Sequence, residues 1–296
     1  MEGHFPTGDE LAFYQTPGPL TRFTRNKELL AGLPARTTAL CGVSNKLIVH
    51  EFVAGGYGVT DAGQRQGELE KRTVGAITSA IARLDPRPLA KGRPPKKRLI
   101  GNCRQFTVLT TALLRRAGVP ARARCGFARY LDPGRWTDHW VVERWDDKQK
   151  RWIRTDAQMD EHFHEMLGYD FDPLDLPAGE FLSGAEAWQR VRAGAGDPRR
   201  FGVDDMHGLW FVAGDLIRDL AALNKVELLP WDVWGAMPQP ADELDSARLA
   251  FLDDVAQVVV AGALDKQREL YRRDGLRVPD EVFSVRFQKT VKVPSS

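Results

Sequence analysis

One stretch of the chain, GNCRQFTVLTTALLRRAGVPARARCGF beginning at Gly101, constrains the fold more than any other. Apolar residues recur at helical spacing through residues 102–117, and Gly118 is a suitable C-terminal stop. The face expected to be buried consists of Phe106, Leu109, Leu113 and Leu114. Residues 121–131 then alternate as a strand does. An amphipathic helix that leads into a strand predicts an α+β fold in which this helix packs on an antiparallel sheet.

The rest of the chain is expected to form an arm, a core and an extension. Residues 1–22 carry three prolines and predict a loose N-terminal arm, residues 23–164 a catalytic core, and residues 165–296 a mostly helical extension packed on the core. Further helices are predicted over residues 24–32, 38–53, 68–84, 185–193, 208–223 and most of 241–274. Strands are predicted over residues 139–145, 151–156 and 281–292, and a Gly-rich loop over 55–67.

Three residues with complementary chemistry lie in this core. Cys103 begins the predicted helix, where unpaired backbone N–H groups and the helix dipole favour a thiolate. His139 opens one strand and Asp156 closes the next. If the connecting turn is centred between Asp147 and Lys148, His139 and Asp156 lie directly opposite, about 5 Å apart at Cβ. This order predicts a nucleophile, a general base and a carboxylate that orients the base.

The segments around these residues resemble a known family. GNCRQFTVLTTALLRRAGVPAR is similar to the signature of the transglutaminase-like cysteine enzymes, in which a Cys helix leads into R-x-x-G-[IV]-P-A-R and a strand. DHWVVERWDDKQKRWIRTD is similar to that family's His strand, turn, Trp strand and Asp. The resemblance covers about residues 98–160. It implies a transglutaminase-like core with Cys103 as nucleophile, His139 as general base and Asp156 as the acid that orients it.

The resemblance is not equal for every branch of the superfamily. WTDHW with RWIRTD is similar to the peptide N-glycanases, but this chain lacks the zinc-binding cysteines of that branch. Animal transglutaminases have an aromatic oxyanion donor before the Cys, whereas no Trp precedes Trp136 here. Papain-like proteases place Cys and His much farther apart.

The family implies a cysteine-dependent acyl-transfer enzyme, either a hydrolase or a transferase. Its substrate would be a small molecule or peptide with an amide, ester or thioester, and a peptide N-glycanase-like amidase or an arylamine N-acetyltransferase-like acyltransferase are narrower versions. The alternative is a non-catalytic transglutaminase-like protein that binds a partner. That class usually lacks triad residues, and all three are present here.

Other residues are weaker candidates for binding. Substrate-binding roles are predicted for Asn102, Trp136, Trp231 and Trp234, the last two in a Pro-flanked loop that could also be core. Asp160, His162, His164 and Glu165 have metal-ligand chemistry, but a polar loop is the simpler interpretation, so no metal and no cofactor are expected.

Composition excludes some partners and favours a compartment. The net charge is +2 and no run of about 18 apolar residues occurs, so neither nucleic acid nor a membrane is an expected partner. MEGHFPTGDELAF lacks the basic and apolar regions of a secretory signal. The three cysteines form no disulfide or zinc pattern, and Cys41 and Cys125 are expected to be small buried residues. A cytoplasmic protein from a GC-rich bacterial gene, rich in Arg, Ala and Gly, fits these features.

Overall fold

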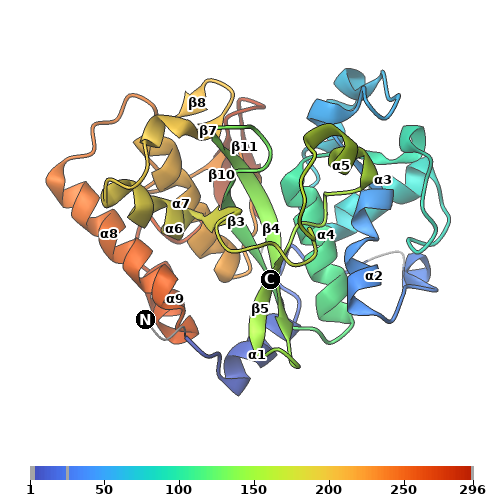
Figure 1. The fold of residues 1–296 in the computed structure, drawn as a ribbon, viewed down its shortest axis with the longest axis horizontal. Helices are drawn as coiled ribbons and strands as arrows, with labels where there is room; N and C mark the ends of the chain where they lie inside the picture. Colours follow the sequence, from blue (N-terminus) through green and yellow to red (C-terminus); the bar gives the residue numbers. More distant parts are fainter. Residues whose placement is uncertain (1–3, 25–26, 295–296) are drawn as a thin grey trace. The chain divides into compact units, whose positions relative to one another are not determined.

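The computed structural model describes residues 4–24 and 27–294, and Figure 1 shows their helices and strands. Helices and strands are both present, as the predicted α+β class requires. The chain forms two compact units, each made of segments far apart in the sequence. Among the described residues, unit 1 combines 4–10, 124–140 and 177–294, and unit 2 combines 11–24, 27–123 and 141–176. The consecutive division predicted after residues 22 and 164 stays a prediction.

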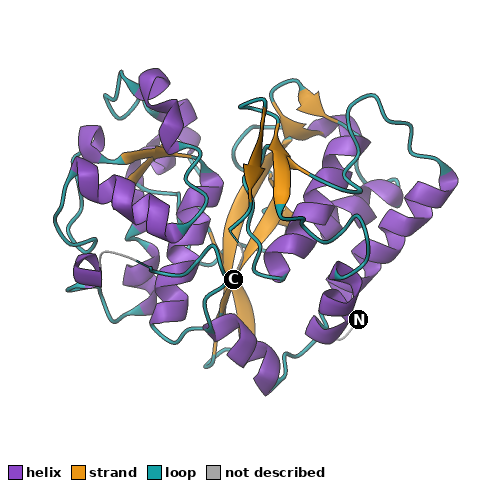
Figure 2. Ribbon diagram, turned by 180° about the vertical axis from the view of Figure 1, so that it is seen from behind, coloured by secondary structure: helices purple, strands orange, loops and turns teal. Residues whose placement is uncertain are grey.

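Unit 2 contains the helix that begins at Cys103 and a short parallel pair of strands. Its α-helices are α2 (Thr37–Cys41), α3 (Val74–Leu84), α4 (Cys103–Arg116) and α5 (Glu161–Leu167), and α1 (Gly8–Gln15) begins in unit 1 and continues in unit 2. Its 3-10 helices are η1 (Lys27–Leu30), η2 (Ser44–Lys46), η3 (Glu51–Val53), η4 (Ala62–Glu68) and η5 (Pro95–Lys97). Strands β1 (Ile48–His50) and β2 (Leu99–Gly101) pair in parallel, and β5 (Arg151–Thr155) belongs to a larger sheet. Figure 2 distinguishes these helices, strands and loops by colour.

Helix α4 is central to unit 2, where it contacts α2, α3, β1 and β2. The four apolar residues predicted to be buried are buried. The opposite face is buried too, which differs from the amphipathic pattern, because its polar side chains are hydrogen-bonded inside the unit. Arg104 donates to the Arg72 carbonyl (2.6 Å) and Gln105 Nε2 to the Glu68 carbonyl (2.9 Å). Gly118 follows the helix with φ 78°, in its predicted role as a stop.

The sequence prediction is wrong over residues 38–53, which form α2, η2, β1 and η3 rather than one helix. Ile48 and Val49 lie in β1 and pair with Leu99 and Ile100. The reason is that a fully buried strand is continuously apolar, so its periodicity does not distinguish it from a helix.

Smaller differences occur elsewhere in the described chain. The predicted loose arm contains α1, the Gly-rich loop contains most of η4, and α3 begins at Val74 rather than residue 68. Thr73 caps α3, since its hydroxyl accepts the Ala76 N–H (3.1 Å). Of the helix predicted over 24–32, residues 25–26 lie outside the described residues, and 27–30 form the 3-10 helix η1.

Unit 1 is mainly helical after residue 177. Its helices are α6 (Gly184–Arg192), η6 (Pro198–Arg200), α7 (Leu209–Leu223), α8 (Ser246–Ala261) and α9 (Leu264–Tyr271), and α6, α7 and α8 contact one another (Figure 1). Its strands are β6 (Phe181–Ser183), β7 (Phe201–Val203), β8 (Met206–His207), β9 (Asp232–Val233), β10 (Glu281–Ser284) and β11 (Lys289–Lys292). The single strand predicted over 281–292 is therefore the hairpin β10–β11. None of the described helices has the length and apolar character needed to cross a bilayer.

Two longer strands carry residues of the predicted site. Strand β3 (Ala121–Ala128) and strand β4 (Trp136–Asp146) are neighbours in the order β6-β3-β4-β7-β8, with β5 also paired to β4. Within unit 1, β3 pairs antiparallel with β6, and β4 pairs in parallel with β7. Within unit 2, β4 pairs antiparallel with β5.

Candidate functional site

Cys103 is the first residue of α4, as the sequence predicts. Strand β2 leads to it through Asn102, whose extended backbone (φ −128°, ψ 176°) turns the chain into the helix. Gln105 Oε1 accepts the Asn102 N–H (2.8 Å) and so fixes this start. The Cys103 side chain is buried, at 6% exposure, and belongs to the turn in which helix N–H groups lack intrahelical partners. This position favours an anion on the sulfur or on a group bound beside it.

Asn102 has an unusual side chain for a buried residue. The residue is 4% exposed, yet its amide nitrogen has no hydrogen-bond partner among the described residues. Leaving a buried polar group without a partner costs about 1–3 kcal/mol. Such groups in folded proteins call for an explanation, and a ligand that completes the hydrogen bonds is one.

His139 and Asp156 are both buried. His139 lies on β4 in unit 1, with its ring edge-on to that of Tyr130 at a centroid distance of 6.1 Å. Asp156 directly follows β5 in unit 2. There it is held in a turn, because its Oδ1 accepts the Gln158 N–H (3.0 Å) and its own N–H donates to the Pro173 carbonyl (2.7 Å). Both residues are thus placed by defined backbone structure.

The register between β4 and β5 differs from the predicted one by two residues. Val142 pairs with Thr155, so the hairpin is centred between Lys148 and Gln149, and its continuation would put Asp156 opposite Val141 instead of His139. The cause is the turn that follows Asp146. Its Oδ1 accepts the N–H groups of Lys148 (2.9 Å) and Gln149 (2.8 Å), and Lys150 adopts φ 53°. The direct opposition predicted for His139 and Asp156 is therefore wrong.

A shift of two residues does not change which side chains share a face. Glu143 is directly paired with Arg154 across the ladder. Glu143 accepts hydrogen bonds from Arg154 Nε (3.1 Å) and from Arg122 Nε on β3 (2.7 Å).

The three tryptophans predicted to bind substrate belong to unit 1, whereas Asn102 belongs to unit 2. Trp136 is half-buried and stacks on Phe201, with ring centroids 5.6 Å apart and planes 3° apart. Trp234 is buried and its indole N–H donates to the Leu276 carbonyl (3.2 Å), a packing contact. Trp231 lies beside Arg286, whose guanidinium carbon is 4.8 Å from the indole centroid. Their substrate-binding roles stay predictions.

The acidic and histidine residues after Asp156 form a helix start instead of the expected loop. Asp160 caps α5, because its Oδ1 accepts the Phe163 N–H (3.2 Å). The same oxygen accepts the Tyr57 hydroxyl (2.6 Å), and burial together with Asp160 raises the pKa of that phenol well above its usual value. Asp160 therefore has a structural role here, while His162 contacts the Tyr57 ring at a centroid distance of 4.3 Å.

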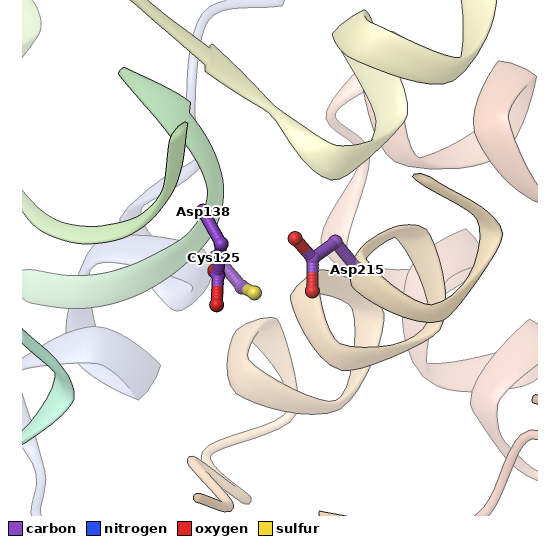
Figure 3. Close-up of side chains that lie close together, drawn as sticks. All are labelled: Cys125, Asp138 and Asp215. Carbon is purple, nitrogen blue, oxygen red and sulfur yellow. The ribbon is translucent and has the colours of Figure 1, made fainter. Parts of the chain in front are cut away.

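One group of side chains was missed by the sequence interpretation. Cys125, Asp138 and Asp215 bring their potential ligand atoms within 4.8 Å of one another in unit 1. Figure 3 shows the three side chains close together. Cys125 was expected to be a buried apolar residue, and its burial is confirmed. The sequence contained one sign of this group. Asp138 directly precedes His139, and because side chains alternate along a strand, it is expected on the opposite face of β4 from His139.

Comparison with known proteins identifies the region around Cys103. Residues 66–157 match the model of the transglutaminase-like superfamily, and this range includes Cys103, His139 and Asp156. The chain has a transglutaminase-like core. This family match supports a cysteine-based catalytic function in general.

The chain has distant similarity to a solved structure. That structure is a candidate cysteine protease from Cytophaga hutchinsonii, with 17% sequence identity and a TM-score of 0.35. The alignment covers 60% of this chain and 46% of that one, so this chain spans less than half of the solved chain. No curated protein matches.

Proposed function

We propose that this protein is a cysteine-dependent acyl-transfer enzyme in which Cys103, His139 and Asp156 act as nucleophile, general base and orienting acid. The observation that carries the proposal is the position of Cys103 at the first residue of α4, inside the segment that matches the transglutaminase-like superfamily. A buried cysteine with only a packing role does not require a helix N-terminus, whereas a thiolate is stabilised there.

The proposed reaction has two halves. In the first, Cys103 gives its thiol proton to His139 and its sulfur attacks the carbonyl carbon of an amide, ester or thioester. His139 then transfers that proton to the leaving group as the bond between the leaving group and the carbon breaks. In the second, water or an amine attacks the thioester, gives a proton to His139 and releases the acyl group from sulfur. Asp156 would hold the imidazole in the productive tautomer and stabilise its protonated form.

Asn102 is the proposed donor to the oxygen that becomes negatively charged. Its side-chain nitrogen is buried without a partner next to the nucleophile. An amide fixed in that state can bind the oxyanion of the tetrahedral intermediate without first breaking another hydrogen bond. The backbone N–H of Cys103 would be the second donor.

The proposed substrate is a small molecule or peptide that carries the acyl group, and hydrolysis or transfer is decided by the acceptor. Mass spectrometry of the intact protein after incubation with a panel of amide, ester and thioester donors tests the proposal. We expect an added acyl mass on the peptide that contains Cys103, with the acyl group identifying the donor. Loss of the adduct in buffer alone would indicate a hydrolase. Loss only after an amine is added would indicate a transferase.

Cys103→Ala is the matched negative control, and Cys41→Ala is the control for a buried cysteine elsewhere in unit 2. An adduct that persists in Cys103→Ala would contradict the covalent mechanism. Binding of a donor with neither adduct nor turnover in the unmodified chain would favour the non-catalytic alternative.

A further inference from the structure

One thiol and two carboxyl groups lie close together in unit 1, and none of them takes part in the proposed reaction. Cys125 comes from β3, Asp138 from β4 and Asp215 from α7, and their potential ligand atoms all lie within 4.8 Å of one another. Figure 3 shows the Asp215 carboxylate pointing toward the Cys125 sulfur and Asp138. Cys125 and Asp215 are fully buried and Asp138 is half-buried.

The group is short of hydrogen bonds and of positive charge. Arg218 Nη1 donates to Asp215 Oδ1 (2.7 Å), but Asp215 Oδ2 and Asp138 Oδ1 are buried and have no hydrogen-bond partner among the described residues. The nearby Arg124 is already engaged, because it donates to both oxygens of Asp219, at 2.8 and 2.7 Å. In this group, Arg218 is thus the arginine that pairs with one of the two carboxylates.

Burial makes the ionised forms of these groups costly without a further cation. It raises the pKa of Asp138 and of the Cys125 thiol well above their usual values, and it raises the pKa of Asp215 to about 6. Buried acidic groups are stable when they hold protons or when they coordinate a metal. Asp215 Oδ2 and Asp138 Oδ1 have no hydrogen-bond donor among the described residues, and a cation bound between the two carboxylates would contact both.

We propose that Cys125, Asp138 and Asp215 bind one divalent cation, with Zn²⁺ the best fit. Such an ion, together with Arg218, would balance one thiolate and two carboxylates. A thiolate ligand favours Zn²⁺ over Mg²⁺ or Ca²⁺, which prefer oxygen alone. Zinc bonds of about 2.0–2.3 Å would need the three ligand atoms to approach one another by about 1 Å. Three protein ligands leave a fourth position for water.

The proposal is independent of the reaction proposed for Cys103, and its test does not use activity. The test is done on the full chain carrying Cys103→Ala, so that zinc cannot bind the thiol of the proposed triad. Protein produced with added Zn²⁺ is dialysed against metal-free buffer and analysed for metal by inductively coupled plasma mass spectrometry. About one equivalent of zinc per chain is expected. Zinc at background level in this protein would overturn the proposal.

Variants of the ligands test whether the bound metal is at this place. In the same background, Cys125→Ala should reduce zinc to background, and Asp138→Asn, at the half-buried position, should weaken zinc affinity by about 100-fold or more in competition with a chelator. Cys41→Ala, which removes another buried cysteine, should keep the full equivalent. Replacing Zn²⁺ by Co²⁺ should give a thiolate-to-metal absorption band that depends on Cys125. Zinc content unchanged by both ligand substitutions would overturn the site.

Discussion

At the scale of single residues, the three cysteines differ in what surrounds the sulfur. Cys41 is the last residue of α2, and burial raises the pKa of its thiol to about 11, against the opposing effect of Arg144. Cys125 is fully buried among acidic groups, which also raise its pKa. Cys103 alone of the three begins an α-helix. Of the three sulfurs, that of Cys103 therefore has the helix N-terminus that stabilises a reactive thiolate.

This difference predicts selective alkylation. With iodoacetamide near pH 7, Cys103 should be modified first, because Cys41 and Cys125 stay protonated and inaccessible at that pH. Peptide mass spectrometry over a time course measures the three rates in one sample. A faster reaction at Cys41 or Cys125 in the folded protein would remove Cys103 from its proposed role. Labelling in urea, where all three should react at similar rates, is the control.

Asn102→Ala tests the proposed oxyanion donor. Loss of one such donor should lower kcat by about 10²–10³-fold, because the interaction forms only as the oxyanion develops. The melting temperature should change little, because the amide nitrogen has no hydrogen-bond partner among the described residues to lose. Asn45→Ala is a matched control, since the Asn45 amide donates to the Met159 carbonyl (3.4 Å) outside the proposed site. Unchanged kcat in Asn102→Ala would assign the oxyanion to other donors.

Asp156→Asn tests the orienting acid. An amide can still bond to imidazole, but it favours the wrong tautomer and cannot stabilise imidazolium, which costs about 10⁴-fold in serine proteases. We expect a smaller loss of about 10²–10³-fold in kcat/KM here, because a thiolate and an imidazolium ionise together more readily. The Gln158 N–H can still donate to the amide oxygen, so the turn should persist. Full activity in this variant would leave a Cys–His pair as the chemistry.

The sequence was sufficient for the local placement of the proposed nucleophile, but it did not reveal the acidic cluster. Cys103 could be placed because a helix start depends on adjacent residues, and the burial of Cys41 and Cys125 follows from their apolar neighbours. Asp215 could not be placed beside Cys125, because that proximity depends on how α7 packs in unit 1. The register error arose from a turn whose hydrogen bonds to Asp146 have no strong sequence signal such as Asn-Gly.

At the scale of elements, long helices with clear end signals were predicted and short buried strands were not. Helices α4, α6 and α7 lie within about one residue of their predicted bounds, since capping residues and apolar spacing define them locally. Strand β1 was assigned to a helix because its pairing partner, β2, lies about fifty residues away in the sequence. Elements whose identity depends on a distant partner are therefore where sequence patterns fail.

The packing of α6 against α7 depends on one glycine. A Cβ built on Gly184, the first residue of α6, would lie 2.4 Å from the Asp215 carbonyl oxygen and 2.6 Å from the Leu216 nitrogen, both backbone atoms that cannot rotate away. Gly184→Ala should therefore force the helices apart and destabilise the protein by about 1–3 kcal/mol or more. Gly55→Ala is the matched control, because nothing lies within 4 Å of its added Cβ. Urea unfolding of both variants measures the difference, and equal stability would contradict the close approach of the two helices.

At the scale of the whole molecule, buried and partly buried acidic groups outside the cluster set how stability depends on pH. Burial is the main cause that raises the pKa of Tyr169 to about 12 and that also raises the pKa of Tyr57 and Tyr271. Together with Cys41, these groups keep their protons in the fold at a pH where the unfolded chain releases them. Since the folded state then binds more protons, its stability falls as the pH rises.

The protonated Cys41 thiol stabilises the folded state, because its pKa is raised by burial from 9.0 to about 11. This stabilisation is present in full below pH 9.0 and is lost as the pH rises toward about 11. Between pH 8 and pH 10.5 this loss should be about 2 kcal/mol of unfolding free energy, with the tyrosines adding to it. Urea unfolding at the two pH values measures the total, and the same comparison in Cys41→Ala should show a smaller fall. A free energy of unfolding that is constant from pH 8 to pH 10.5 would mean that these groups ionise in the folded protein as easily as in the unfolded chain, and would contradict their burial.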